Sequence, residues 1–289
     1  MKIITMTAWR RPDYFQQVLT ALSNCIGVED YHIIISIDGG YPIAQGEMME
    51  IAENSTLDCE VIAWDESENL GCAENTRTVL ERGFSHPVDW VIHLEDDTLP
   101  SKDYLQFMEA CLEKYADSEQ IFSICGYQGN HDRDWVSPWF TGDAESVGLV
   151  DWFTCWGWGT WRRVWEQIKD DWFGISWNRE GLDFKAAHGY SPHGEDFLRC
   201  VDVNNRGSWA QPMNHYWREH IGSPYEIKPA VSRIQNIGAT DGVFMISEAF
   251  HRAKHHTQHF ITDLTAIDPP DYEGGLDYEF ADDEIPGSE

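Results

Sequence analysis

Three carboxylates in a row, Glu95-Asp96-Asp97, directly follow an apolar segment at residues 88–94. Adjacent carboxylates at the end of a buried strand repel one another unless a cation or hydrogen bonds compensate their charge. Carboxylate oxygens are the ligands that Mn²⁺ and Mg²⁺ prefer. The run therefore predicts a divalent metal site, with a turn that caps the next helix as the alternative.

Other chemically capable side chains follow other apolar segments. Thr7, Arg10 and Arg11 come at or just after residues 2–7, and Asp38 comes directly after residues 31–37. In an open parallel sheet, ligands bind outside the carboxyl ends of the strands. We therefore expect these residues to share one site with the acidic run. The alternatives are solvated arginines and a simple Asp-Gly-Gly turn.

The elements that must position these residues alternate between strand and helix over the first 125 residues. Apolar, β-branched runs predict strands, and segments with helical spacing predict helices between them. This alternation predicts an α/β fold of Rossmann-like type, a mostly parallel sheet with helices on both faces. The predicted strands are residues 2–7, 31–37, 59–64, 88–94 and 120–125, and the predicted helices are 12–24, 46–54, 72–84 and 101–115, the last capped by Ser101.

The second half of the chain has a different composition. Nine of the fourteen tryptophans lie between residues 135 and 177. Such a stretch predicts either a compact core or a wall of a sugar pocket, because flat aromatic faces stack on pyranose rings. Helices are expected at residues 193–206 and 247–260. Residues 262–289 hold ten Asp or Glu and no Lys or Arg, which predicts an acidic tail without a packed core.

The ordered series of motifs resembles the nucleotide-sugar-dependent glycosyltransferases of GT-A fold. It is most similar to the inverting N-acetylglucosaminyltransferase I type and its family-2-like relatives. The likeness spans residues 1–125 well and 145–260 in patches. The matching segments are Thr7-Ala8-Trp9-Arg10-Arg11-Pro12, Asp38, Asn69-Leu70-Gly71 with the following Asn75 and Arg77, His93-Leu94-Glu95-Asp96-Asp97, and Val231-Ser232-Arg233 with Asn236-Ile237-Gly238 and Gly242.

The resemblance implies a UDP-sugar donor, Mn²⁺ (or Mg²⁺) as cofactor and a glycan-type acceptor. It implies that Asp97 binds the metal, that Asp96 holds the ribose and that Glu95 reaches the donor sugar. It also implies that Asp38 accepts a hydrogen bond from uracil. The remaining donor-binding positions that it implies, or that the tryptophan-rich stretch suggests, are Thr7, Arg10, Arg11, Asn75, Arg77, Trp158 and Arg233. In relatives a histidine stands where this chain has Asn75.

Inverting transfer needs a carboxylate that takes the proton of the acceptor hydroxyl. The sequence Gly194-Glu195-Asp196-Phe197 resembles the second acidic motif of these enzymes. One register favours Glu195, and the common Glu-Asp pattern favours Asp196, which we prefer. A helix N-terminus stabilises carboxylates whatever their role, so a capping function is the alternative.

The resemblance also implies one GT-A domain in two halves, a nucleotide-sugar-binding half at residues 1–125 and an acceptor-binding, catalytic half at residues 126–261. The formal net charge of the 289-residue chain is −30, which argues against nucleic acid as a partner. No run approaches ~20 apolar residues, and residues 1–6 read as a strand rather than a leader, so we expect no membrane span and a cytoplasmic enzyme.

Two other functions fit parts of the pattern. A sugar-nucleotide nucleotidyltransferase shares the fold class, but residues 7–13 lack the glycine-rich loop expected there. A non-catalytic glycan-binding module would use the tryptophans and would leave Asp38 and the acidic run without a purpose.

Overall fold

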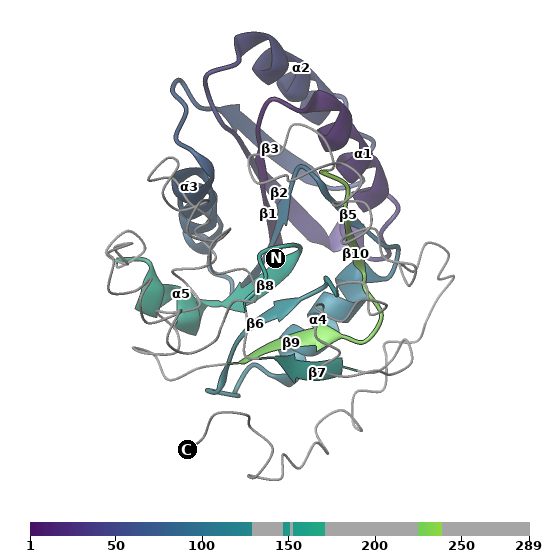
Figure 1. Ribbon diagram of the computed structural model, residues 1–289, viewed down its shortest axis with the longest axis vertical. Coiled ribbons are helices and arrows are strands. Elements are labelled where there is room, and N and C mark those ends of the chain that lie inside the picture. The colour runs from purple at the N-terminus through teal and green to yellow at the C-terminus, as the bar shows by residue number, and fades with distance from the viewer. Residues whose placement is uncertain (129–146, 151–152, 171–224, 239–289) are drawn as a thin grey trace, which may run out of the picture.

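One sheet of eight strands organises the protein, in the order β3-β2-β1-β4-β8-β6-β9-β7 (Figure 1). The computed structural model describes residues 1–128, 147–150, 153–170 and 225–238. The strands of this sheet are β1 (Lys2–Ala8), β2 (Tyr31–Ile37), β3 (Glu60–Asp65), β4 (Trp90–Glu95), β6 (Ile121–Cys125), β7 (Val147–Val150), β8 (Trp158–Trp161) and β9 (Tyr225–Pro229).

The first half of the sheet is parallel, as the alternation of strands and helices predicts. Strand β1 pairs in parallel with β2 on one side and with β4 on the other, and β2 pairs in parallel with β3. In this register Thr7 lies between Ser36 and Glu95. The segments that follow β1, β2 and β4 therefore leave the sheet at the same edge.

Helices cover both faces of the parallel half. Figure 1 shows α1 and α2 on one side of β1–β3 and α3 on the other, so the predicted α/β class is confirmed. Apolar side chains of β1, β2 and β4, apart from the half-buried Trp90, are buried between these layers. The helices are α1 (Pro12–Leu22), α2 (Pro42–Glu53), α3 (Cys72–Phe84), α4 (Tyr104–Lys114) and α5 (Arg162–Ile168), with a 3₁₀ turn η1 (Val28–Asp30).

The second half of the sheet is mixed rather than parallel. Strand β8 runs antiparallel to both β4 and β6, and it brings Trp158 and Trp161 into the middle of the sheet. Strand β9 then pairs in parallel with β6, and β7 pairs antiparallel with β9. Segments that are about a hundred residues apart in the sequence thus lie side by side.

A small second sheet was not predicted. Strands β5 (Thr98–Pro100) and β10 (Ile234–Asn236) pair antiparallel directly after the acidic run. The predicted helix start at Ser101 is wrong, because α4 begins at Tyr104 and Ser101 instead donates a hydrogen bond to Asp103, 2.6 Å away. Asp103, the residue directly before α4, also pairs with the distant Arg233.

Candidate functional site

The acidic run, Arg11 and Asp38 meet at the carboxyl edge of β1, β2 and β4, the location where an open α/β sheet binds ligands. The backbone N–H of Trp9 donates to Asp96 Oδ2 over 2.9 Å, which ties the end of β1 to the end of β4. The expectation that these segments assemble is thus fulfilled in the geometry of the sheet.

Arg11 is paired with two carboxylates at once. Its Nη1 lies 2.8 Å from Asp97 Oδ2, and its Nη2 forms an ion pair with Asp96 Oδ1. Burial alone would lower the pKa of Arg11, but the two carboxylates outweigh it and raise that pKa. Arg11 therefore acts as the counter-cation of the acidic run within the described residues, rather than pointing freely outward.

Burial and mutual repulsion disfavour the ionised forms of two carboxylates in the acidic run. Burial, opposed by Arg11 and reinforced by Asp97, raises the pKa of Asp96 to about 6. Burial and the two neighbouring aspartates raise the pKa of Glu95 well above its ordinary value. A further cation at this edge would relieve both effects.

Asp97 has an oxygen that no protein group satisfies. Its Oδ1 is buried and has no hydrogen-bond partner. An unpartnered buried carboxylate oxygen is costly unless a ligand completes it. The described ranges contain no cluster of three side chains able to ligate a metal. One carboxylate still fits Mn²⁺ or Mg²⁺, because such ions are commonly held by one or two carboxylates and the phosphates of a substrate.

The chain crosses the acidic run again just after β10. The N–H of Ile237 donates to the carbonyl of Asp97 over 2.8 Å. A Cβ added to Gly238 would lie 2.2 Å from Asp97 Oδ2, so any other residue here would displace that carboxylate. The predicted nucleotide-covering segment therefore lies against the predicted metal ligand, as far as residue 238.

Asp38 is buried, and its carboxylate organises the loop that follows β3. It accepts hydrogen bonds from the backbone N–H groups of Gly39, Leu70 and Gly71 at 2.9, 2.7 and 3.0 Å. Burial raises its pKa above the ordinary value despite these donors. Since a carboxylate offers about four acceptor positions, one remains for the predicted uracil contact. The Asp-Gly-Gly turn alternative accounts only for the contact with Gly39, because Leu70 and Gly71 belong to the loop after β3.

An aromatic and cationic cluster stands beside this loop. The Arg10 guanidinium lies 4.3 Å from the ring centre of Trp9 and 5.5 Å from that of Tyr41. Arg10 also has a left-handed backbone, with φ of 48°, which is uncommon for a residue other than glycine. Sequence analysis missed Tyr41, although an aromatic residue directly after the Asp-Gly-Gly turn was an available signal.

Two predicted donor-binding residues on α3 have partners within the protein. Asn75 is buried and binds Ser36 of β2, with the serine hydroxyl 2.5 Å from its Oδ1. Arg77 pairs along its own helix with Glu81 at 3.2 Å and with Glu74 at 3.8 Å. These contacts favour a structural role for Asn75 and the exposed-helix alternative for Arg77.

Two other predicted donor contacts are corrected by burial. Trp158 is 0% exposed and packs edge-on against Phe153, with ring centres 4.9 Å apart, so it belongs to the core. Arg233 is also fully buried, and its Nε donates to Asp103 over 3.0 Å. Neither side chain offers a surface to a nucleotide, because each is enclosed by elements from the opposite half of the chain.

The two candidates for the catalytic base come from a later segment of the chain. Glu195 and Asp196 fall outside the described residues, as do the acidic tail at residues 262–289 and both expected helices at 193–206 and 247–260. Among the helices that the structure does describe, none is both long and apolar enough to cross a membrane.

Comparison with known proteins gives partial likenesses. No family of known sequences and no curated protein matches the chain. Among solved structures, S. aureus TarS 1-349 matches over 76% of this chain and 73% of its own, at 11% identity and a TM-score of 0.44. The same protein in complex with UDP matches over 49% of this chain, at 13% identity and a TM-score of 0.39.

A mannosyltransferase from Pyrobaculum calidifontis, in complex with GDP-Man and Mn²⁺, matches over 58% of this chain at 13% identity and a TM-score of 0.43. The chain spans only 40% of the UDP-bound TarS structure and 46% of the mannosyltransferase. These likenesses are to glycosyltransferases that use nucleotide sugars, but their values are too low to assign the chain to either family.

Proposed function

We propose that the protein is a metal-dependent, inverting glycosyltransferase of GT-A fold. It transfers a hexosyl or N-acetylhexosaminyl group from a UDP-sugar to a hydroxyl of a glycan-type acceptor. The observation that carries the proposal is the unpartnered Asp97 Oδ1, buried at the ligand-binding edge of a parallel sheet beside two further carboxylates. No hydrogen bond within the described residues explains that oxygen.

In this proposal, different residues at this edge bind different parts of the nucleotide sugar. Asp97 holds the divalent ion, which when bound neutralises the charge of the diphosphate. Asp38 retains one acceptor position for uracil, and Arg10 presents its cation beside Trp9 and Tyr41. Glu95 is half-buried at the end of β4, and in this proposal its carboxylate contacts the donor sugar.

The transfer step exchanges one C–O bond for another. The acceptor oxygen attacks the anomeric carbon from the face opposite the diphosphate, so the configuration inverts. The carboxylate of Asp196, with Glu195 as the alternative, takes the hydroxyl proton as this bond forms. The bond to the diphosphate oxygen breaks, and UDP leaves with the bonding electrons.

The alternatives differ in what they predict at this edge. A nucleotidyltransferase consumes a nucleoside triphosphate and a sugar phosphate and releases pyrophosphate. A non-catalytic glycan-binding module needs exposed tryptophans, yet Trp158, Trp161 and Trp165 are all buried. These three rings, among the tryptophans that the structure describes, are therefore not available to stack on a glycan.

Calorimetric titration of UDP into metal-stripped protein, with and without Mn²⁺, tests the proposal. We expect binding that requires Mn²⁺ and that falls at least about tenfold in Asp97→Asn, a loss of about 1.4 kcal/mol. Asp89→Asn is the matched control, because Asp89 is exposed and lies at the opposite end of β4. Absence of UDP binding in both conditions would overturn the proposal.

Product analysis completes the test. UDP release from a UDP-sugar in the presence of an acceptor supports transfer, and NMR of the new linkage reports whether the configuration inverts. Pyrophosphate release from UTP and a sugar phosphate would instead support the nucleotidyltransferase.

A further inference from the structure

A buried pair of opposite charges lies on β9, away from the acidic run. Glu226 is 0% exposed and the Lys228 side chain is 9% exposed. The two residues are two apart on a strand, so their side chains lie on the same face of the sheet. A buried ion pair is weak evidence for stability, because desolvation of the two charges offsets their attraction. The pair therefore calls for another explanation.

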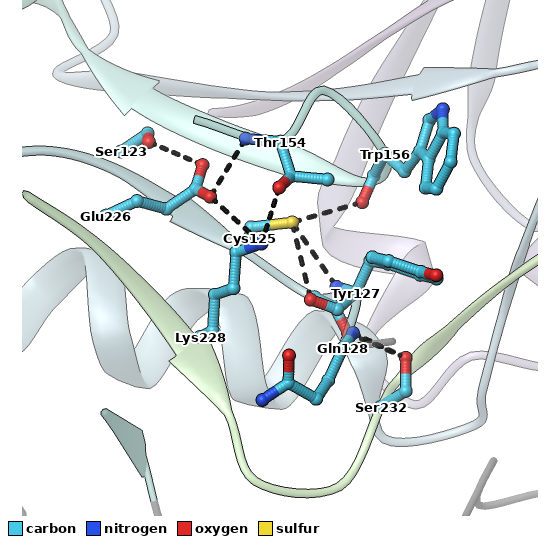
Figure 2. A network of polar contacts seen from close by, with 10 residues as sticks. Ser123, Cys125, Tyr127, Gln128, Thr154, Trp156, Glu226, Lys228 and Ser232 are labelled. Atoms are coloured by element: carbon cyan, nitrogen blue, oxygen red, sulfur yellow. Dashed lines mark hydrogen bonds and ion pairs between the residues drawn. The ribbon is translucent and has the colours of Figure 1, made fainter. Parts of the chain in front are cut away.

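Both charges converge on one residue of a distant segment. Glu226 accepts hydrogen bonds from the Ser123 hydroxyl at 2.8 Å and from the backbone N–H of Thr154 at 3.0 Å. Lys228 donates to the Thr154 hydroxyl and lies 3.6 Å from Glu226 Oε2. Figure 2 shows Thr154 held between the two side chains, at its backbone and at its hydroxyl.

The residues after Thr154 lead toward the candidate site. Cys155 is half-buried, and the charge of Glu95 is among the causes, after burial, that raise the pKa of its thiol. The carbonyl of Trp156 accepts a hydrogen bond from the Cys125 thiol at 3.4 Å. The half-buried Trp156 ring stands edge-on to Tyr127, with ring centres 4.8 Å apart (Figure 2).

The segment 154–156 thus joins two places, the buried charges at one end and Glu95 at the other. Strand β8 starts two residues later, and its Trp158 pairs with His93 of β4. A shift of Thr154 would be passed along a short, extended stretch to the residues beside Glu95. Two charged contacts on a single threonine resist such a shift more firmly than a neutral hydrogen bond does.

We propose that Glu226 and Lys228 are positioning residues, which hold segment 154–156 in place as a wall of the nucleotide-sugar site beside Glu95. This inference rests on the proposed function for the identity of the ligand. The contacts of Glu226 and Lys228 with Thr154, here called the clamp, do not depend on the proposed function.

Alkylation of Cys155 by iodoacetamide, followed by peptide mass spectrometry, measures both parts of the inference. In the wild type, UDP with Mn²⁺ should slow the reaction of Cys155 about fivefold or more and leave the half-buried Cys59 unchanged. Without nucleotide, Lys228→Met should accelerate Cys155 about tenfold, because local opening of the segment exposes the thiol. Glu226→Gln should also accelerate the alkylation of Cys155.

Matched controls separate positioning from general loosening. Lys169→Met removes a half-buried lysine whose side chain pairs with the nearby Glu166 in the described contacts, and it should leave both cysteines unchanged. Equal acceleration of Cys155 and Cys59 in Lys228→Met would show global destabilisation and overturn the inference. If Lys228→Met fails to fold, Ser123→Ala replaces it as the test variant. It removes a hydrogen bond to Glu226 and keeps the contact between Lys228 and Thr154. Cys155 of this variant should still react faster than Cys155 of the wild type.

The two proposals fail in different ways. If UDP binds with Mn²⁺ by calorimetry but does not protect Cys155, the wall assignment is overturned and the proposed function stands. If UDP does not bind at all, the proposed function is overturned. The nucleotide-free rates in Lys228→Met and Glu226→Gln then decide the clamp alone, and unchanged rates would overturn it.

Discussion

At the residue scale, one arginine determines how the acidic run is held in the absence of a ligand. Arg11 satisfies Asp96 and one oxygen of Asp97, and it leaves the other oxygen of Asp97 without a partner. The arginine therefore neutralises part of the charge and leaves one carboxylate oxygen for the cation that the proposed function requires. This arrangement leads to a test that needs no substrate.

Arg11→Met should destabilise the protein and make Mn²⁺ more stabilising than it is in the wild type. Removal of one partner from a buried ion pair costs about 3–5 kcal/mol. Mn²⁺ should recover part of this loss, because a ligand that binds only the folded state stabilises it. Urea unfolding with and without Mn²⁺ measures both effects, and Arg77→Met, which removes a surface pair, should cost less than about 1 kcal/mol. Equal stabilisation of both proteins by Mn²⁺ would contradict the prediction.

Glu226 should make stability depend on pH in a defined direction. Burial raises its pKa from the ordinary 4.5 to about 7. The folded state therefore holds this proton more tightly than the unfolded state. Its stabilising effect is complete below about pH 4.5 and is lost as the pH rises toward 7.

Glu226→Gln removes this dependence, because glutamine does not titrate. The free energy of unfolding of the variant, relative to that of the wild type, should rise between about pH 4.5 and pH 7, by on the order of 3 kcal/mol at most. Urea unfolding at several pH values measures it. The exposed Glu113→Gln is the control, and a constant difference between Glu226→Gln and wild type would contradict the assignment.

At the scale of elements, the short pairing of β5 with β10 brings a late segment onto the acidic run. Ile237 and Gly238 follow β10 directly, and they contact Asp97 through backbone atoms. Backbone contacts of this kind are insensitive to side-chain identity except where a Cβ would collide. Gly238 is such a position.

Gly238→Ala should weaken binding of UDP with Mn²⁺ by about tenfold or more, because its Cβ would displace the Asp97 carboxylate. Calorimetry measures the affinity. Gly46→Ala is the matched control, since a Cβ there meets nothing within 4 Å and the residue lies inside α2. That control should raise stability by about 0.5–1 kcal/mol and leave the affinity unchanged. Undiminished affinity in Gly238→Ala would show that Asp97 need not occupy its present position.

At the scale of the whole molecule, the net charge of −30 sets the response to salt. Like charges repel one another more strongly in the compact state than in the extended chain, and salt screens that repulsion. We expect the melting temperature to rise with NaCl near pH 7. The rise should shrink near pH 4, where carboxylates with ordinary pKa values lose much of their charge. Thermal melts at two salt concentrations and two pH values measure it, and an equal response at both pH values would contradict the electrostatic cause.

Local sequence patterns were sufficient to predict the parallel half of the fold and the edge of the sheet where the candidate site lies. Helix α3 and strand β2 have the predicted bounds, because apolar periodicity and turn residues act over a few positions along the chain. The acidic run, Arg11 and Asp38 could be assigned to one edge for the same reason, since parallel strands end together.

The partner of each of these side chains, in contrast, depends on how distant segments pack together. Arg233 binds Asp103, Trp158 enters the core, and Arg11 neutralises Asp96 and Asp97. Strands β8, β9 and β10 arrive from far along the sequence and enclose side chains that local patterns would leave at a surface. Burial and charge pairing depend on these distant neighbours, so they are properties of the packed molecule and not of any one segment.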